Sequence, residues 1–278
     1  MPDSQLVDET GTVAPAGTDP AGLPKDRRNW IAAVLAVVLL VVIVGVWQLA
    51  VTQEWTSSLV LPPPADVFAS LKNGFATAQG SWWPDIWVTL SETVIGFAIG
   101  VVAAMVVGAV FAYVDVLRKA VYPYVLFMQT FPKIAVAPLL VAWLGYGAAP
   151  KIVISALLAF FPVFTNTITG LSRINGNERR LIRSCGANWL QELWYLRLPN
   201  AKPYIFAAMD VALVVALLGT IVGEFVGSKS GLGYRIQQST AFGDTASVYA
   251  VLIILGALGI ALHFVMVALK SWLVFEED

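Results

Sequence analysis

The sequence predicts an all-α, polytopic membrane protein with six transmembrane helices. Of its 278 residues, 58% are apolar and 13% are charged, and the mean hydropathy is +0.75. An average soluble domain is about 45–50% apolar and about 25% charged, so this chain departs from both averages in the direction that a lipid solvent requires. The second observation is a series of apolar stretches, each long enough to cross the hydrocarbon of a bilayer as a helix.

The first 29 residues are polar and rich in Pro, Gly, Thr and Asp, which predicts a disordered cytoplasmic tail over 1–29. Residues 30–50 follow with one polar side chain, Gln48. A helix of this length measures about 31 Å and can span the membrane. A cleaved signal peptide is the competing interpretation, but its apolar core would be about 7–15 residues long and would precede a small-residue cleavage site. We therefore expect an uncleaved first transmembrane helix.

Residues 51–85 form an extracytoplasmic connection. It contains Leu61-Pro62-Pro63-Pro64, which excludes a helix there, and then residues 65–75, which predict a short amphipathic helix at the membrane interface. A five-helix transmembrane core is expected over 86–270, followed by a cytoplasmic tail over 271–278. The spans of the core are predicted at 86–113, 121–144, 152–170, 203–225 and 246–269.

The basic residues predict the orientation. With the N-terminus inside, twelve of them fall in cytoplasmic segments and four fall in outer segments, namely Lys72, Lys151, Lys229 and Arg235. Short cytoplasmic loops are enriched in Lys and Arg, so both termini are expected in the cytoplasm. The formal net charge of −1 leaves no basic surface for nucleic acid.

A polar segment at 171–202 separates the fourth and fifth spans and carries six basic residues with apolar residues between them. A simple connection would need only a few residues, so we expect short amphipathic helices outside the bilayer that present a surface to a partner. An interfacial helix resting on anionic lipid is the alternative.

This segment resembles a family pattern. Importer permeases of the ATP-binding-cassette (ABC) class carry E-A-A, three residues, G, nine residues and I-x-L-P on the cytoplasmic side. Here Gly186 is followed after nine residues by Leu196-Arg197-Leu198-Pro199, whereas the opening positions are Arg180-Leu181-Ile182, with Glu178 two places earlier. The opening positions do not match the pattern, whereas the glycine and the terminal Leu-Pro are in register. The resemblance implies that this segment forms the surface that couples to an ATPase. Its candidate residues are Glu178, Arg180, Leu181, Ile182, Arg183, Gly186, Ala187, Leu196, Leu198 and Pro199.

Other stretches resemble the branch of this family that includes nitrate, sulfonate, taurine and pyrimidine-precursor importers. They are Leu61-Pro62-Pro63-Pro64, Thr89-Leu90 with Gly96-Phe97 and Gly100, Pro132-Lys133-Ile134-Ala135 with Pro138-Leu139, Trp143-Leu144-Gly145 with Lys151, Phe161-Pro162 with Asn166-Thr167 and Gly170, and Glu224 with Ser230-Gly231-Leu232-Gly233-Tyr234. The resemblance therefore extends over almost everything after the first span.

The resemblance implies the permease subunit of an importer of the type I fold, paired with a second permease copy in what is expected to be a homodimer. A separate ATPase dimer would bind ATP and Mg, and an extracytoplasmic binding protein would deliver a nitrate-, sulfonate- or taurine-like anion or a heterocyclic precursor. This chain contains no phosphate-binding loop, so we expect no enzyme activity and no cofactor of its own.

Two alternatives to this function agree less well with the sequence. An ion-gradient-driven secondary transporter would show repeated halves, which are absent here. A membrane enzyme or a metal site would need clustered nucleophiles, bases or ligands, and the chain has one cysteine, Cys185, and one histidine, His263.

Residue-level expectations follow for the backbone and the pathway. Gly186 should end one short helix in the left-handed conformation, and Pro199 should stop the next before the fifth span. The four-residue repeat from Gly96 to Ala112 predicts helix packing. The candidates for the translocation pathway are Gln129, Lys133, Asn166, Thr167, Thr220 and Glu224.

Glu224 and Lys133 each leave alternatives open. Glu224 either borders an outer gate or pairs near the outer interface, for example with Lys229, and it should face nearly the same way as Asp210 on an unbroken helix. Pro132 should interrupt the hydrogen-bond ladder of the third span. Lys133 lies beside it and either attracts an anionic substrate, neutralises Glu224 or snorkels. His263 is expected to bond between helices.

Overall fold

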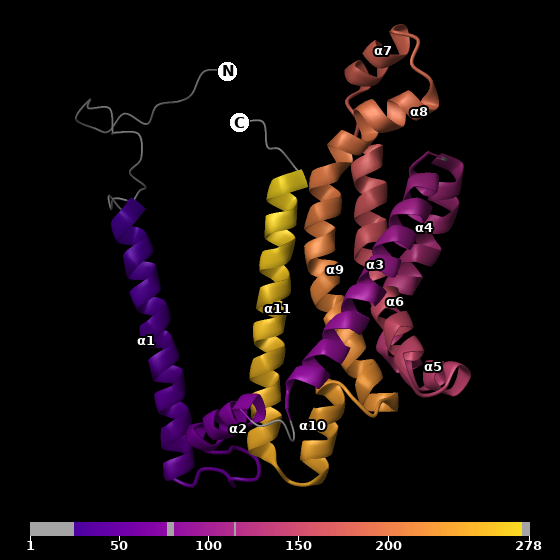
Figure 1. Ribbon diagram of the computed structural model, residues 1–278. Helices are drawn as coiled ribbons and strands as arrows, with labels where there is room; N and C mark the ends of the chain where they lie inside the picture. Colours follow the sequence, from indigo (N-terminus) through magenta and orange to yellow (C-terminus); the bar gives the residue numbers. More distant parts are fainter. Residues whose placement is uncertain (1–24, 77–80, 114, 274–278) are drawn as a thin grey trace, which may run out of the picture. The chain divides into compact units, whose positions relative to one another are not determined.

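The structure is a computed structural model that describes residues 25–76, 81–113 and 115–273 (Figure 1). It divides into two compact units, residues 1–66 and 67–278. Within the described ranges every regular element is a helix, which confirms the predicted all-α class.

The first unit contains α1, which runs from Lys25 to Thr52. The predicted span at 30–50 lies inside this helix, but the helix begins earlier than predicted. Residues 25–29 belong to α1 and not to a tail, because Lys and Arg are good helix formers. The rest of the predicted tail, 1–24, lies outside the described residues. Within this unit, Trp47 of α1 donates a hydrogen bond from Nε1 to the carbonyl oxygen of Pro62 at 3.0 Å.

The predicted interfacial helix is α2, which runs from Pro64 to Ala76. Pro64 is its first residue, where a missing N–H is not needed by the helix. Residues 61–63 precede α2 in a non-helical conformation, as predicted, whereas the expectation that Pro64 is also non-helical was wrong.

The second unit is built on four long helices, which are α3 (Trp83–Tyr113), α6 (Ala148–Ser172), α9 (Leu198–Gly227) and α11 (Thr245–Leu273). Helix α6 packs against both α3 and α9, while α11 and α10 (Leu232–Ala241) pack against α9 (Figure 1). Helix α11 continues past the predicted start of the C-terminal tail at 271, and residues 274–278 lie outside the described residues.

The small-residue stripe of α3 packs against α6. A Cβ atom added to Gly96 would overlap Ser155, and one added to Gly100 would lie 2.5 Å from the Ala156 carbonyl oxygen. On α9, a matching row of Ala208, Ala212 and Ala216 is buried against the same core. Small residues let helix backbones approach closely in lipid. The predicted packing role of the stripe is confirmed as a contact within the chain.

The third predicted span is broken. It consists of α4 (Asp115–Thr130), a 3₁₀ turn (Lys133–Val136) and α5 (Ala137–Leu144). The two sides of the break are bent by 75°. Pro132 lies at the break and cannot donate a backbone hydrogen bond, so it interrupts the helix where the sequence predicted.

The polar segment forms α7 (Gly176–Ser184), α8 (Trp189–Glu192) and a π turn (Leu193–Arg197) that leads directly into α9. Gly186 has φ +78°, which confirms that it ends α7 in the left-handed region. The expectation for Pro199 was wrong, because Pro199 lies in the first turn of α9 and does not stop a helix. A proline is tolerated there because the first N–H groups of a helix have no partner within it.

Five of the described helices are long and apolar enough to cross a membrane, and the bent pair Pro123–Thr130 with Lys133–Leu144 makes a sixth when it is counted as one span. This agrees with the six predicted spans. Helices α7 and α8 lie at one end of the long helices of the second unit, and α10 lies at the other (Figure 1).

Candidate functional site

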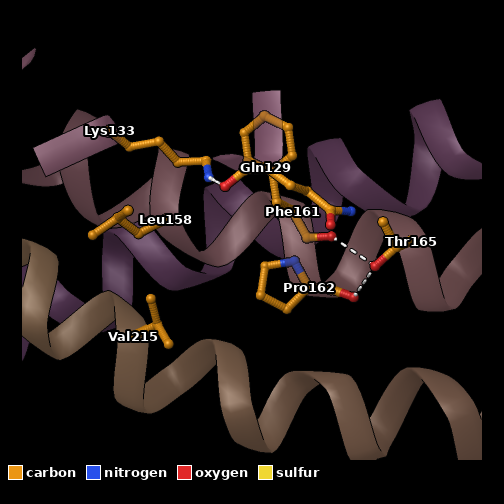
Figure 2. A pocket seen from close by; sticks show the side chains of 7 residues that line it. All are labelled: Gln129, Lys133, Leu158, Phe161, Pro162, Thr165 and Val215. Carbon is orange, nitrogen blue, oxygen red and sulfur yellow. Dashed lines mark hydrogen bonds between the residues drawn. The ribbon is translucent and has the colours of Figure 1, made fainter. Parts of the chain in front are cut away.

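A cavity of about 280 Å³ opens beside the break in the third span (Figure 2). Two predicted pathway residues, Gln129 and Lys133, line it together with Thr165, which the sequence analysis did not select. The full lining is Gln129, Lys133, Leu158, Phe161, Pro162, Thr165 and Val215. The break at Pro132 brings the two polar side chains of the third span against α6 and α9.

Lys133 supplies the positive charge of this cavity. Its Nζ donates to the main-chain carbonyl oxygen of Gln129 at 3.0 Å and lies 4.6 Å from the centre of the Phe161 ring. No carboxylate of the described residues lies within ion-pair distance of this ammonium, so it does not neutralise Glu224. Cations within transmembrane segments usually pair with an acid or a backbone carbonyl and face the bundle interior or a water-filled cavity, and Lys133 has the carbonyl partner and the cavity.

The other four predicted pathway residues do not line this cavity. The Asn166 amide donates back to the Pro162 carbonyl oxygen at 2.9 Å. Thr220 accepts a hydrogen bond from Thr93 at 3.0 Å and is fully buried. Thr167 is also buried, and its hydroxyl oxygen has no partner among the described residues. A pathway role for these residues stays a prediction.

Glu224 is fully buried near the end of α9, where it holds the turn into α10. Its carboxylate accepts hydrogen bonds from the Thr89 hydroxyl at 2.8 Å and from the Gly233 N–H at 2.6 Å. A Cβ at Gly231, which has φ +103°, would overlap this carboxylate. The partners of Glu224 are thus Thr89 and Gly233 and not Lys229, while a gating role stays a prediction.

Two ion pairs extend this network. Asp85 and Arg235 pair at 2.6 Å, and Lys151 pairs with Glu92 at 2.6 Å. Lys151 was expected in an outer segment before the fourth span, whereas it is buried in the first turn of α6. The placement is physically permitted because a buried carboxylate compensates the ammonium. These contacts join α3, α6, α9 and α10 at one end of the unit.

Asp210 does not share the environment of Glu224. It contacts His263 of α11, with Oδ1 2.7 Å from Nδ1. Glu224 instead contacts α3 and α10. The expected bond of His263 between helices is confirmed, but the two acids have partners on different helices, because α9 is packed on several sides.

At the other end of the unit, Glu192 is the centre of an arginine cluster that the sequence analysis missed. This carboxylate is buried and pairs with Arg197 at 2.6 Å, Arg179 at 3.1 Å and Arg183 at 3.3 Å. Arg197 also donates to the Leu171 carbonyl oxygen at 3.0 Å. Glu192 therefore links α7 to α8, to the π turn and, through Arg197, to the end of α6.

Apolar side chains on the same segment are exposed. Leu181 is 67% exposed, Trp189 66% and Tyr195 76%. Of the ten predicted coupling residues, six are exposed and four are partly buried. The exposed ones are Glu178, Arg180, Leu181, Arg183, Gly186 and Pro199, and the partly buried ones are Ile182, Ala187, Leu196 and Leu198. The segment thus presents charged and apolar groups together on a surface that the chain itself leaves open.

The chain belongs to the family of binding-protein-dependent transport system inner membrane components, which matches residues 74–274. It is therefore the permease subunit of an ABC importer, and the secondary-transporter alternative is excluded. The expected branch is confirmed by its relatives. The putative aliphatic sulfonates transport permease SsuC of Bacillus subtilis is 29% identical and aligns over 84% of this chain and 83% of its own length.

Two further relatives align over most of their lengths. The riboflavin transport system permease RibX of Chloroflexus aurantiacus is 32% identical over 90% of this chain and 92% of its own length. The taurine transport system permease TauC of Escherichia coli is 28% identical over 85% of this chain and 87% of its own length. Among solved structures, a chain of an inward-facing MetNI methionine ABC transporter superimposes with a TM-score of 0.60 at 22% sequence identity. The superposition covers 67% of the present chain and 93% of the MetNI chain. This likeness confirms the type I importer fold.

Proposed function

We propose that this chain forms, with a second copy of itself, the membrane pathway of an importer that is powered by a separate ATPase. The ATPase dimer binds ATP and Mg²⁺, and the permease contributes no cofactor and no catalytic residue. The segment from α7 to the π turn lies in the cytoplasm, as do both termini, and a binding protein delivers the solute on the opposite side.

The observation that carries this proposal is the exposed surface around Leu181 and Trp189. An arginine cluster fixes α7 against α8 while leaving these apolar side chains uncovered. Exposed apolar groups rimmed by charges are typical of protein interfaces. The positive charge of the segment also agrees with a cytoplasmic location.

The relatives support a small organic solute. Their names assign sulfonates, riboflavin, a formylaminopyrimidine and taurine to them. We propose a small solute for the present chain, either an anion of the sulfonate, taurine or nitrate type or a heterocyclic precursor.

Co-purification with the ATPase tests the proposal. Leu181→Asp places a charge in the centre of the exposed surface without removing any hydrogen bond that holds the segment. If this surface docks the ATPase, the variant should recover about tenfold less ATPase at equal permease, because an apolar contact that contributes about 1.4 kcal/mol to an interface changes its affinity about tenfold.

Phe242→Asp is the matched control, because Phe242 is 81% exposed and follows α10 at the other end of the unit. The control should retain the ATPase fully. Equal ATPase recovery from both variants would contradict the docking surface and favour a segment that rests on lipid.

A further inference from the structure

We propose that the cavity beside Lys133 is a binding site for a small organic anion, with the ammonium of Lys133 holding a sulfonate or carboxylate group and the walls of α6 and α9 holding its apolar part. The inference rests on the proposed function, because it assigns a substrate class to the pathway of that permease.

The cavity lies near the middle of the spans. Leu158 and Phe161 fall close to the centre of α6, which runs from Ala148 to Ser172, and Val215 falls close to the centre of α9. A group bound there is therefore far from the lipid headgroups at either interface. A lipid phosphate would have to leave the headgroup region to reach Lys133, so a solute in transit is the occupant that fits.

The charge of the cavity is positive and is not balanced from within the described part of the chain. The Lys133 ammonium has three donor hydrogens, and one bond, to the Gln129 carbonyl oxygen, is formed. The ion pairs of the described long helices lie elsewhere: Lys151 pairs with Glu92, and Asp210 pairs with His263. Near the middle of the membrane, an anion that enters the cavity would supply the negatively charged partner that the Lys133 ammonium lacks.

Size and lining restrict the anion further. A volume of about 280 Å³ is below the range of drug-sized ligand sites, which starts at roughly 300 Å³. Leu158, Phe161 and Val215 form an apolar wall, and the Gln129 side-chain amide adds a second polar group on the Thr165 side of the cavity (Figure 2). This arrangement suits an amphipathic anion with one charged end and a short aliphatic or aromatic body.

Charge-selective labelling of the assembled permease and ATPase tests the inference and does not require the cargo to be identified. In a Cys185→Ser chain, which lacks the one native cysteine, Val215→Cys places a thiol in the cavity wall. A thiol reagent that carries a sulfonate should react faster than its trimethylammonium counterpart, after correction for their rates with a free thiol. Lys133→Met should lower this preference about tenfold, and Lys133→Arg should keep it.

Protection adds a second readout. Butanesulfonate should slow the labelling of Val215→Cys in chains with Lys133 or Lys133→Arg but not in Lys133→Met, and butanol should not slow it in any of them. Thr165→Cys, on α6, provides a second reporter in the same cavity. Lys72→Met serves as the control lysine, because Lys72 is exposed on α2 and does not line the cavity.

The possible failures are distinguishable. An unchanged charge preference in Lys133→Met, or no reaction of either reporter with either reagent, overturns the anion site. ATP hydrolysis by the same preparations reports separately on the proposed function. A complex that hydrolyses ATP while showing no preference for the anionic reagent overturns this inference alone, whereas an assembly without ATPase activity overturns the proposed function and with it the inference.

Discussion

Glu224 has no exposed surface, so each of its carboxylate oxygens depends on a partner within the chain. Glu224→Gln replaces one acceptor oxygen by an NH₂ group, and a donor then faces either the Gly233 N–H or the Thr89 hydroxyl. A buried group that loses its partner costs about 1–3 kcal/mol. We expect a lower Tm for the assembled transporter, measured by thermal unfolding in detergent.

The same variant separates a structural role of Glu224 from a gating role. Glu54→Gln is the matched control, because Glu54 is exposed, and its Tm should not change. If uptake per folded Glu224→Gln transporter equals that of the unmodified protein, the gate hypothesis is wrong, although the structural role stands. An unchanged Tm would contradict the structural role.

At the scale of the element, α7 is held to the rest of the unit mainly by the Glu192 carboxylate, which accepts from Arg179 and Arg183. Glu192→Gln removes the negative charge and weakens both bonds while Gln can still accept from Arg197. Hydrogen bonds to charged groups contribute on the order of 2 kcal/mol, so amide exchange within α7 should become about thirtyfold faster. Hydrogen-exchange mass spectrometry of peptides covering 176–184 measures this.

Glu178→Gln provides the comparison for Glu192. Glu178 is exposed in the first turn of the same helix, and its substitution should leave exchange in α7 almost unchanged. If the two variants showed similar rates of amide exchange within α7, Glu192 would not be what holds α7 in place.

The sequence predicted best those features of the fold that are determined by residues within the same stretch of chain. Apolar length defines the spans, Pro132 cannot donate a hydrogen bond, and Gly186 alone among nearby residues adopts φ +78° at little cost. Pro199 was assigned wrongly because a proline is compatible with both the end and the first turn of a helix. Which of the two applies depends on whether the chain continues as a helix after the proline, as α9 does.

The candidate site was predictable only in part, because charge partners are chosen by tertiary packing. Lys133 and Gln129 were selected from a polar pair beside a proline. Glu192 and Glu92 were missed, since nothing in the sequence indicates that arginines up to 13 residues away, or Lys151 on another helix, converge on them. Thr165 was missed because a threonine on a transmembrane helix usually bonds its own backbone, which Thr165 also does.

For the whole molecule, the two ends of the second unit differ in chemistry. One end carries the arginine cluster around Glu192 beside exposed aromatic side chains, and the other carries the buried network around Glu224. An importer driven by an ATPase needs these ends on opposite sides of the membrane. Cys185 is exposed next to Gly186 at the arginine end, so the native chain already contains a reporter for its orientation.

We expect Cys185 to react with a membrane-impermeant thiol reagent only when the reagent has access to the cytoplasmic side, as in inverted membrane vesicles. Bound ATPase should slow this reaction, and removal of the ATPase should restore it, because the docking surface at Leu181 adjoins Cys185. Phe242→Cys in a Cys185→Ser chain should show the opposite sidedness. Labelling of Cys185 from the outer side would contradict the predicted orientation, and an ATPase in the cytoplasm could then not bind this segment.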